Sequence, residues 1–386
     1  MSAITKLVSK TKQANKTFYR TERLEAQTGN DSMKFNYNGI SQFSSIRNTA
    51  SSSTLDRLGF KSEGTNLNLR YQNNTIIADS LFGIKYNLSN FDLNKYGFNH
   101  VTSEKTMGLY QNNNASQLAI LTDGIYNNID FTVNTLDNQT SLLNTLSGLN
   151  LTYFKRAPSQ LFDKDAKSLN QRVAKNVSNS NKDFVTITYQ VIAPPHSQLY
   201  VSIPNISWSD DNNHSLSITV NGVTRNQVTD NTFDFFDLGY FETESMVTIK
   251  LSFPGNKAIS FDNPSFYALD TQNYQIAMDT INERDSKVTT SNNKVFVDYS
   301  SKMNASLFFT IPYDKGWTAT INHKKVKIQR AQKGFMKVDV PSGKGKVVLT
   351  FIPYGLKTGS LISLLASIIF CCYAYFIRKT TIIQKS

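Results

Sequence analysis

The C-terminal stretch Ser306–Ile377 decides the fold; it reads SLFFTIPYDKGWTATINHKKVKIQRAQKGFMKVDVPSGKGKVVLTFIPYGLKTGSLISLLASIIFCCYAYFI. Its last part, Thr358–Ile377, has no charged residue and is followed by Arg378 and Lys379. Twenty helical residues span roughly 30 Å, the thickness of the hydrocarbon core of a bilayer. A buried core helix is the alternative, but such helices usually carry a polar stripe. We therefore predict a transmembrane helix over 358–377. Its membrane-embedded side chains would include Leu361, Leu364, Leu365, Ile368, Ile369 and Phe370.

The part of this stretch before the helix has a β pattern. The runs SLFFTIPY, GWTATIN, KKVKIQR, GFMKVDV and KVVLTFIP are separated by short polar or glycine-containing turns. Such runs are typical of antiparallel strands joined by tight turns. We expect a meander of successive strands that continues into the membrane helix through Tyr354–Lys357, so that the last β unit lies directly on the bilayer.

Two further regions lie upstream. From Leu161, runs such as VTITYQVIA and SMVTIKLSF recur between Pro, Gly and Asn turns, which predicts an antiparallel sandwich or jelly roll. Before it, helix patterns at Ser53–Phe60 and Gln139–Leu146 are mixed with strand patterns, which predicts an α/β portion. A polar break at Tyr267–Arg284 predicts a short helix between the two β units.

The predicted fold class is therefore α+β, mainly β. An N-terminal α/β portion is followed by two antiparallel β-sandwich or jelly-roll-like units and one C-terminal transmembrane helix. The expected domains are 1–160 (α/β), 161–270 (first sandwich), 271–356 (second sandwich), 358–377 (membrane helix) and 378–386 (tail).

Charge indicates the kind of partner, and cysteine usage indicates the side of the membrane. The formal net charge is +12, which favours anionic partners such as membrane headgroups and cell-wall polyanions, although it also serves solubility. No nucleic-acid-binding pattern is present, so nucleic acid is not an expected partner. Residues 1–357 contain no cysteine. We expect residues 1–357 to be extracytoplasmic and the C-terminus to be cytoplasmic, with Arg378, Lys379 and Lys385 on the inner side.

The first twenty residues, MSAITKLVSKTKQANKTFYR, contain no apolar segment of the kind found in a secretion signal. If residues 1–357 are exported, the export signal must lie upstream of this sequence. We expect this sequence to be the C-terminal part of a longer membrane protein.

Aromatic residues beside acidic and amide residues are candidates for carbohydrate contact, because sugar rings stack on aromatic faces and sugar hydroxyls need polar partners. This pattern occurs at Trp208 with Asp210 and Asp211, and at Phe235. The alternative is that these aromatic residues form the sandwich core. The four histidines show no ligand spacing, so no metal site is predicted, and no motif indicates a cofactor or a catalytic residue.

Several segments occur in the order seen in a known family. They are TFYRTE at Thr17–Glu22, NDSMKFNYNGISQFSS at Asn30–Ser45, DSLFGIKY at Asp79–Tyr86, and PYDKGW at Pro312–Trp317 with the strands and helix after it. The chain resembles the extracytoplasmic region and last transmembrane helix of the YfhO family of bacterial integral membrane proteins. One departure is Asn322-His323, where the family usually has Asp/Asn-Gly, which leaves the turn type of that hairpin open.

The resemblance implies a membrane protein like the GT-C glycosyltransferases, which moves sugars from polyprenyl-phosphate donors onto polymers such as lipoteichoic acid. The membrane helices and catalytic loop of the family are not in this sequence, so no catalytic residue is carried over, and the chain alone is expected to be inactive. Its expected role is to bind or position an acceptor. The expected partners are the membrane and an anionic cell-envelope polymer or a polyprenyl-phosphate-linked sugar. The alternative is a non-enzymatic, membrane-anchored envelope-binding or carbohydrate-binding protein.

Overall fold

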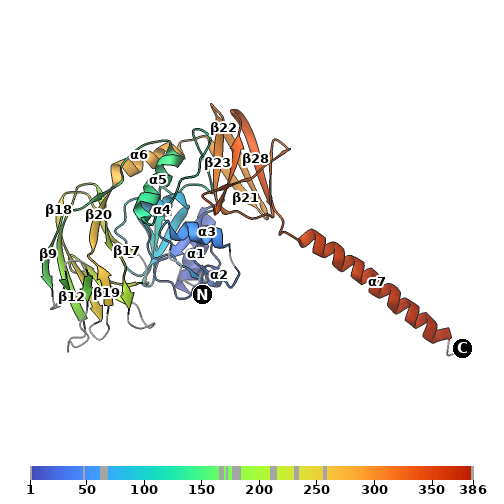
Figure 1. The fold of residues 1–386 in the computed structure, drawn as a ribbon, viewed down its shortest axis with the longest axis horizontal. Helices are drawn as coiled ribbons and strands as arrows, with labels where there is room; N and C mark the ends of the chain where they lie inside the picture. Colours follow the sequence, from blue (N-terminus) through green and yellow to red (C-terminus); the bar gives the residue numbers. More distant parts are fainter. Residues whose placement is uncertain are drawn as a thin grey trace.

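The computed structural model describes residues 2–46, 48–60, 68–164, 169–170, 173–175, 184–208, 215–229, 234–254 and 259–383. Strand outweighs helix, at 43% against 23%, and nearly all strand pairs are antiparallel. The predicted class, α+β and mainly β with one C-terminal apolar helix, is confirmed (Figure 1).

The N-terminal portion combines one mixed sheet with short helices. Its sheet has the order β1 (Arg20–Arg23), β4 (Ile84–Ser89), β6 (Met107–Asn112), β5 (Phe98–Glu104), and β1 runs parallel to β4. A two-stranded ribbon joins β2 (Gln42–Phe43) to β3 (Asn68–Leu69). The helices are α1 (Ala3–Ala14), α2 (Asp31–Phe35), α3 (Thr49–Asp56), α4 (Ile76–Leu81) and α5 (Thr135–Ser147). Side-chain caps begin α3 and α4, where Asn48 accepts from Ser51 N and Thr75 accepts from Ala78 N.

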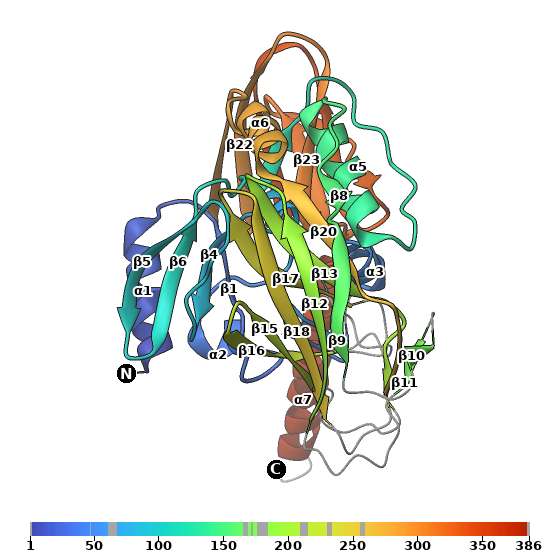
Figure 2. The ribbon, with the colours of Figure 1, turned by 90° about the vertical axis from the view of Figure 1, so that its left-hand side faces the viewer.

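The first β unit packs two antiparallel sheets face to face (Figure 2). One has the order β16 (Val223–Val228), β15 (Ser215–Val220), β18 (Ser245–Pro254), β12 (Phe184–Ala193), β9 (Ser159–Lys164). The other has the order β17 (Asp234–Phe241), β13 (Ser197–Ile203), β20 (Ser265–Asp270), β8 (Phe154–Arg156). A smaller sheet has the order β10 (Leu169–Asn170), β11 (Val173–Lys175), β19 (Ile259–Asp262), β14 (Ser207–Trp208). Alternate apolar side chains such as Val191, Val201 and Ile249 are fully buried between the sheets.

The predicted connecting helix is α6 (Thr271–Asn282), capped by Asp270, and the second β unit follows it. One sheet of this unit has the order β21 (Ser286–Ser291), β22 (Lys294–Ser301), β28 (Gly343–Phe351), β24 (Trp317–Ile321), β25 (Lys324–Val326). The other has the order β26 (Gln329–Ala331), β27 (Phe335–Val340), β23 (Ala305–Pro312), β7 (Ala119–Leu121).

The expectation of a meander in this unit is wrong. The hairpins β24–β25 and β26–β27 form, but β23 pairs with β27 and β24 pairs with β28. The chain alternates between the two sheets: β24, β25 and β28 lie in one, and β23, β26 and β27 lie in the other. This arrangement lets the apolar faces of both sheets bury one shared core. In the β24–β25 hairpin, Asn322 and His323 both have positive φ, at 46° and 70°, which is the pattern of a type I′ turn and answers the question raised by its sequence.

One hydrophobic core joins all three portions. Ile77 of α4, Leu143 of α5, Met278 of α6, Tyr200 of β13 and Phe308 of β23 belong to the same buried cluster. The N-terminal portion therefore packs between the two β units rather than standing apart from them.

Helix α7 (Leu356–Ile383) leaves the body beside the second β unit (Figure 1). Leu356–Ile377 is long and apolar enough to cross a membrane, and none of its apolar window is buried against the protein. Those 22 residues extend about 33 Å, enough for the bilayer core. The predicted lipid-facing side chains are all exposed on it: Leu361, Leu364, Leu365, Ile368, Ile369 and Phe370.

Candidate functional site: a polar groove over a buried charged network

A groove of about 420 Å³ lies between the N-terminal portion and the first β unit. Its walls come from four separate parts of the chain: the loop 24–29 after β1, Ser41 just before β2, residues 68–72 at and after β3, and residues 226–228 at the end of β16. Strand β16 is held there because Arg225 donates to the carbonyl of Asp92 at 2.9 Å and stacks over Phe91. The groove thus depends on the packing of two units.

Most residues that line the groove have polar side chains, and apolar residues such as Leu24, Leu69 and Val228 lie among them. Glu25 and Arg70 contribute opposite charges, and the other polar groups are amides and hydroxyls. Within the described part of the chain, the side-chain amides of Gln72 and Gln227 have no hydrogen-bond partner, and Gln72 Oε1 is buried without one. Unpartnered amides in a groove are available to a ligand that brings its own donors and acceptors.

Ser41 and Tyr71 connect the groove to a carboxylate beneath it. Ser41 Oγ donates to Glu22 Oε2 at 2.9 Å and accepts from Tyr71 N at 3.0 Å. Glu22 also accepts from the backbone N–H groups of Ile40 and of Ser41, the latter at 3.0 Å. The carboxylate of Glu22 therefore accepts three hydrogen bonds from residues just before β2. These bonds hold the backbone at Ser41, which lines the groove.

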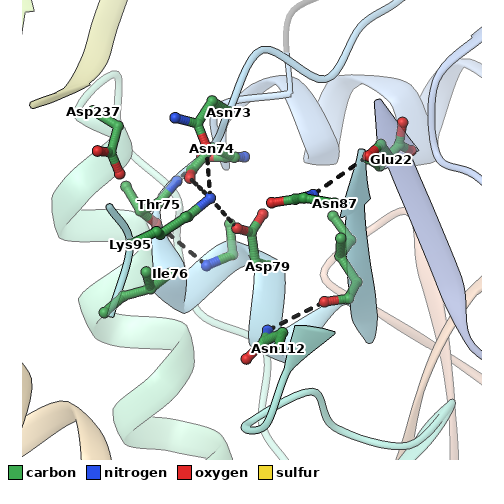
Figure 3. A network of polar contacts seen from close by, with 12 residues as sticks. Glu22, Asn73, Asn74, Thr75, Ile76, Asp79, Asn87, Lys95, Asn112 and Asp237 are labelled. Carbon is green, nitrogen blue, oxygen red and sulfur yellow. Dashed lines mark hydrogen bonds and ion pairs between the residues drawn. The ribbon is translucent and has the colours of Figure 1, made fainter. Parts of the chain in front are cut away.

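Lys95 is the centre of the network below the groove (Figure 3). Its ammonium group forms an ion pair with Asp79, and both side chains are completely buried. It also donates to Asn73 Oδ1 at 2.8 Å, to the carbonyl of Asn74 at 2.9 Å and to Tyr71 Oη at 3.3 Å. A buried ion pair is tolerated only where further hydrogen bonds compensate for lost hydration, as they do here. The loop Gln72–Thr75 is therefore tied to one cation.

Burial controls the titration of these carboxyls. Burial raises the pKa of Glu22 to about 7, although the hydrogen bonds from Ser41 and Ile40 act to lower this pKa. It raises the pKa of Asp79 to about 6, although Lys95 opposes that shift. Burial likewise raises the pKa of Asp237, on neighbouring β17, to about 6. These groups are sealed from solvent, so the geometry gives them a positioning role: they hold the groove preformed rather than contact a ligand.

The predicted carbohydrate-binding residues fall elsewhere. Trp208 on β14 is 7% exposed and packs in the core of the first β unit. Phe235 on β17 is 4% exposed and packs in the core shared by the three portions, edge-on to Tyr200. The structure therefore does not bring these two side chains together, and Asp210 and Asp211 lie outside the described residues. The role of this set in carbohydrate binding stays a prediction.

Sequence reasoning missed the groove and its network. The run Arg20–Arg23 is charged at three of four positions, yet all four residues are buried. A signal was present: Glu22 ends the segment TFYRTE and Asp79 begins DSLFGIKY, two of the segments that carried the family resemblance.

A sequence model of the family described as "Bacterial membrane protein YfhO" matches residues 1–363. The chain belongs to the YfhO family. It is 25% identical over 141 residues to "Uncharacterized protein YfhO" of Bacillus subtilis (strain 168), a match that covers 34% of this chain and 16% of that relative. Family membership and helix α7 together indicate a membrane protein of the bacterial cell envelope.

Two solved structures match this YfhO-family chain distantly. A family two carbohydrate esterase from Cellvibrio japonicus matches with a TM-score of 0.18 and 10% identity, over 30% of this chain and 34% of that one. The tandem CBM22 domains of Paenibacillus barcinonensis Xyn10C match with a TM-score of 0.18 and 11% identity, over 52% of this chain and 86% of that one. At these scores the matches carry no argument about function.

Proposed function

We propose that this chain is the extracytoplasmic part of a YfhO-family membrane protein that binds or positions an acceptor polymer of the cell envelope, of the lipoteichoic-acid type, for glycosylation. In this proposal, residues 1–357 lie outside the cell and the C-terminus lies in the cytoplasm. Sugar transfer itself takes place in membrane helices that this sequence does not include.

The polar groove is the observation that supports acceptor binding. Its volume of about 420 Å³ falls in the range of small-molecule sites, roughly 300–1,000 Å³. Amides such as those of Gln72 and Gln227 pair with sugar or glycerol hydroxyls, and a guanidinium such as that of Arg70 pairs with a phosphate diester. The net charge of +12 raises the local concentration of a polyanion. Because buried hydrogen bonds and an ion pair hold the backbone under the groove, we expect the cost of ordering it on binding to be small.

The binding test uses the full chain in nanodiscs with purified lipoteichoic acid as the probe. A Gln72→Ala/Gln227→Ala double variant removes two unpartnered amides, and the affinity should fall by about 5- to 150-fold at about 0.5–1.5 kcal/mol for each lost hydrogen bond. The matched control is Gln272→Ala on α6, which removes an exposed amide far from the groove in sequence and structure. Equal affinity in the double variant and the control would show that lipoteichoic acid does not bind through these groove amides.

Orientation is tested separately. Alkaline phosphatase joined after Lys357 in the native gene should be active, and phosphatase joined after Ser386 should be inactive. The reverse pattern would place residues 1–357 in the cytoplasm and would contradict an extracellular acceptor.

A further inference from the structure

Four segments meet where the body joins α7, and one of them, the start of α3, is far from the other three in sequence. Asn48 Nδ2 donates to the carbonyl of Tyr313 at 2.6 Å, which holds the start of α3 against the turn after β23. Ile352 N donates to the carbonyl of Gly316 at 3.0 Å, which holds the same turn against the connection to α7. Thr54 Oγ1 donates to the carbonyl of Gln332 at 2.7 Å, which adds the β26–β27 turn. These contacts build one surface next to the first residue of the membrane helix.

Large apolar side chains project from this surface. Ile46, two residues before Asn48, is 90% exposed, and Tyr354, two residues before α7, is 80% exposed. Figure 1 shows α3 on the side of the body from which α7 departs. Exposed aliphatic and aromatic residues beside a membrane helix fit the interfacial zone of a bilayer, where an apolar side chain is buried and a phenol stays hydrated.

Cations lie beside the aromatic rings of this surface. Lys315 Nζ lies 5.7 Å from the ring centre of Tyr354, and the guanidinium of Arg330 lies 4.5 Å from that of Tyr313. Lys333 and Lys357 are also exposed there. Within the described part of the chain none of the four is ion-paired, and the neighbouring carboxylate of Asp314 accepts from Gly316 N at 2.7 Å. The surface therefore carries an excess of positive charge.

We propose that this surface docks onto the headgroups of anionic phospholipids. The docking end is defined by six residues: Ile46, Lys315, Arg330, Lys333, Tyr354 and Lys357. Its cations bind lipid phosphates while Ile46 and Tyr354 enter the interface. The position of α7 supports this partner, because the apolar span that is long enough to cross a bilayer begins at Leu356, within one helical turn of Tyr354. The inference does not depend on the groove: it concerns how the body is held on the membrane, whatever the groove binds.

The test measures whether Ile46 reaches the lipid. The full chain is reconstituted in vesicles of phosphatidylcholine and phosphatidylglycerol that contain a lipid brominated near the headgroup, and tryptophan quenching is compared in two variants. Ile46→Trp adds a reporter at the docking end, and Met246→Trp adds one at an equally apolar, exposed position on β18, on the far side of the molecule (Figures 1 and 2). The parent chain corrects for Trp208 and Trp317.

We expect quenching of Ile46→Trp that rises with the phosphatidylglycerol content, and no quenching of Met246→Trp. Adding Lys315→Gln, Arg330→Gln and Lys333→Gln should lower the ratio of docked to undocked molecules by about fivefold for each cation, and so by about a hundredfold. Hydrogen exchange of residues 42–46 in the unmodified chain gives a second readout, with protection that rises with anionic lipid. Equal quenching of the two reporters, together with exchange that is independent of lipid charge, would overturn the proposal.

Discussion

Replacing Lys95 with methionine should be among the most damaging changes to this protein. The methionine fills a similar volume but leaves four acceptors without their donor: the carboxylate of Asp79, Asn73 Oδ1, the carbonyl of Asn74 and Tyr71 Oη. Removing one partner of a buried ion pair costs about 3–5 kcal/mol, because the remaining charge stays buried without compensation. For a chain of this size we expect the thermal midpoint to fall by roughly 4–6 °C.

A second substitution separates the charge from the packing. In Lys95→Met/Asp79→Asn the uncompensated charge is gone, so the double variant should regain about 1–3 kcal/mol over Lys95→Met despite carrying one more change. The loss in Lys95→Met should also be smaller at pH 5 than at pH 8, because without Lys95 the pKa of Asp79 rises further and the neutral acid is tolerated. The assay is thermal unfolding of the full chain in detergent. A double variant as unstable as the single variant at both pH values would refute this reasoning.

Three further predictions use the same unfolding assay. The pKa of Glu22 is raised from 4.5 to about 7, so the folded state holds the extra proton and Glu22 should lower stability by up to about 3 kcal/mol as the pH rises from about 4.5 to about 7. Glu22→Gln should make the loss of stability with pH smaller and leave the part due to Asp79 and Asp237, and an unchanged slope between about pH 6 and pH 7 would contradict the assignment. Gly316→Ala should cost about 1–3 kcal/mol, because a methyl group there would overlap the carbonyl oxygen of Ile352 and the ring of Phe351, and a wild-type midpoint would count against this packing. Trp208→Ala should cost about 3–5 kcal/mol through lost core packing, and if lipoteichoic-acid binding survives in the folded fraction, Trp208 has no part in it.

Local patterns predicted local structure well. The helix expected at 139–146 is the centre of α5, and the one expected within 267–284 is α6, because both have clear apolar periodicity and a polar cap. The helix expected from Ser53 starts earlier, at Thr49, because Asn48 accepts from Ser51 N at 3.1 Å and acts as the cap.

Pairings between distant segments could not be predicted in the same way. The alternating runs of the second β unit fit a meander as well as two facing sheets, since periodicity shows which residues are buried but not which strand lies alongside. The groove combines residues 24–29, Ser41, 68–72 and 226–228, whose proximity depends on how two units pack. Lys95 looks like an ordinary surface lysine in the sequence, and only the fold encloses it with Asp79.

The pairing of β7 with β23, and of β8 with β20, has a consequence for how the chain can be divided and how it folds. Both of the earlier strands come from the N-terminal portion, yet each supplies the last strand of a sheet built from later sequence. A fragment that began at residue 161 or 271 would leave the edge of β20 or β23 unpaired, and Leu307, Phe308 and Phe309 of β23 would lie on an exposed edge that recruits other chains. Such fragments should aggregate. During synthesis, β7 and β8 are made before β23 and β20, the strands with which they pair. Neither sheet can be completed until the later strands are present, so the body should fold as one cooperative unit.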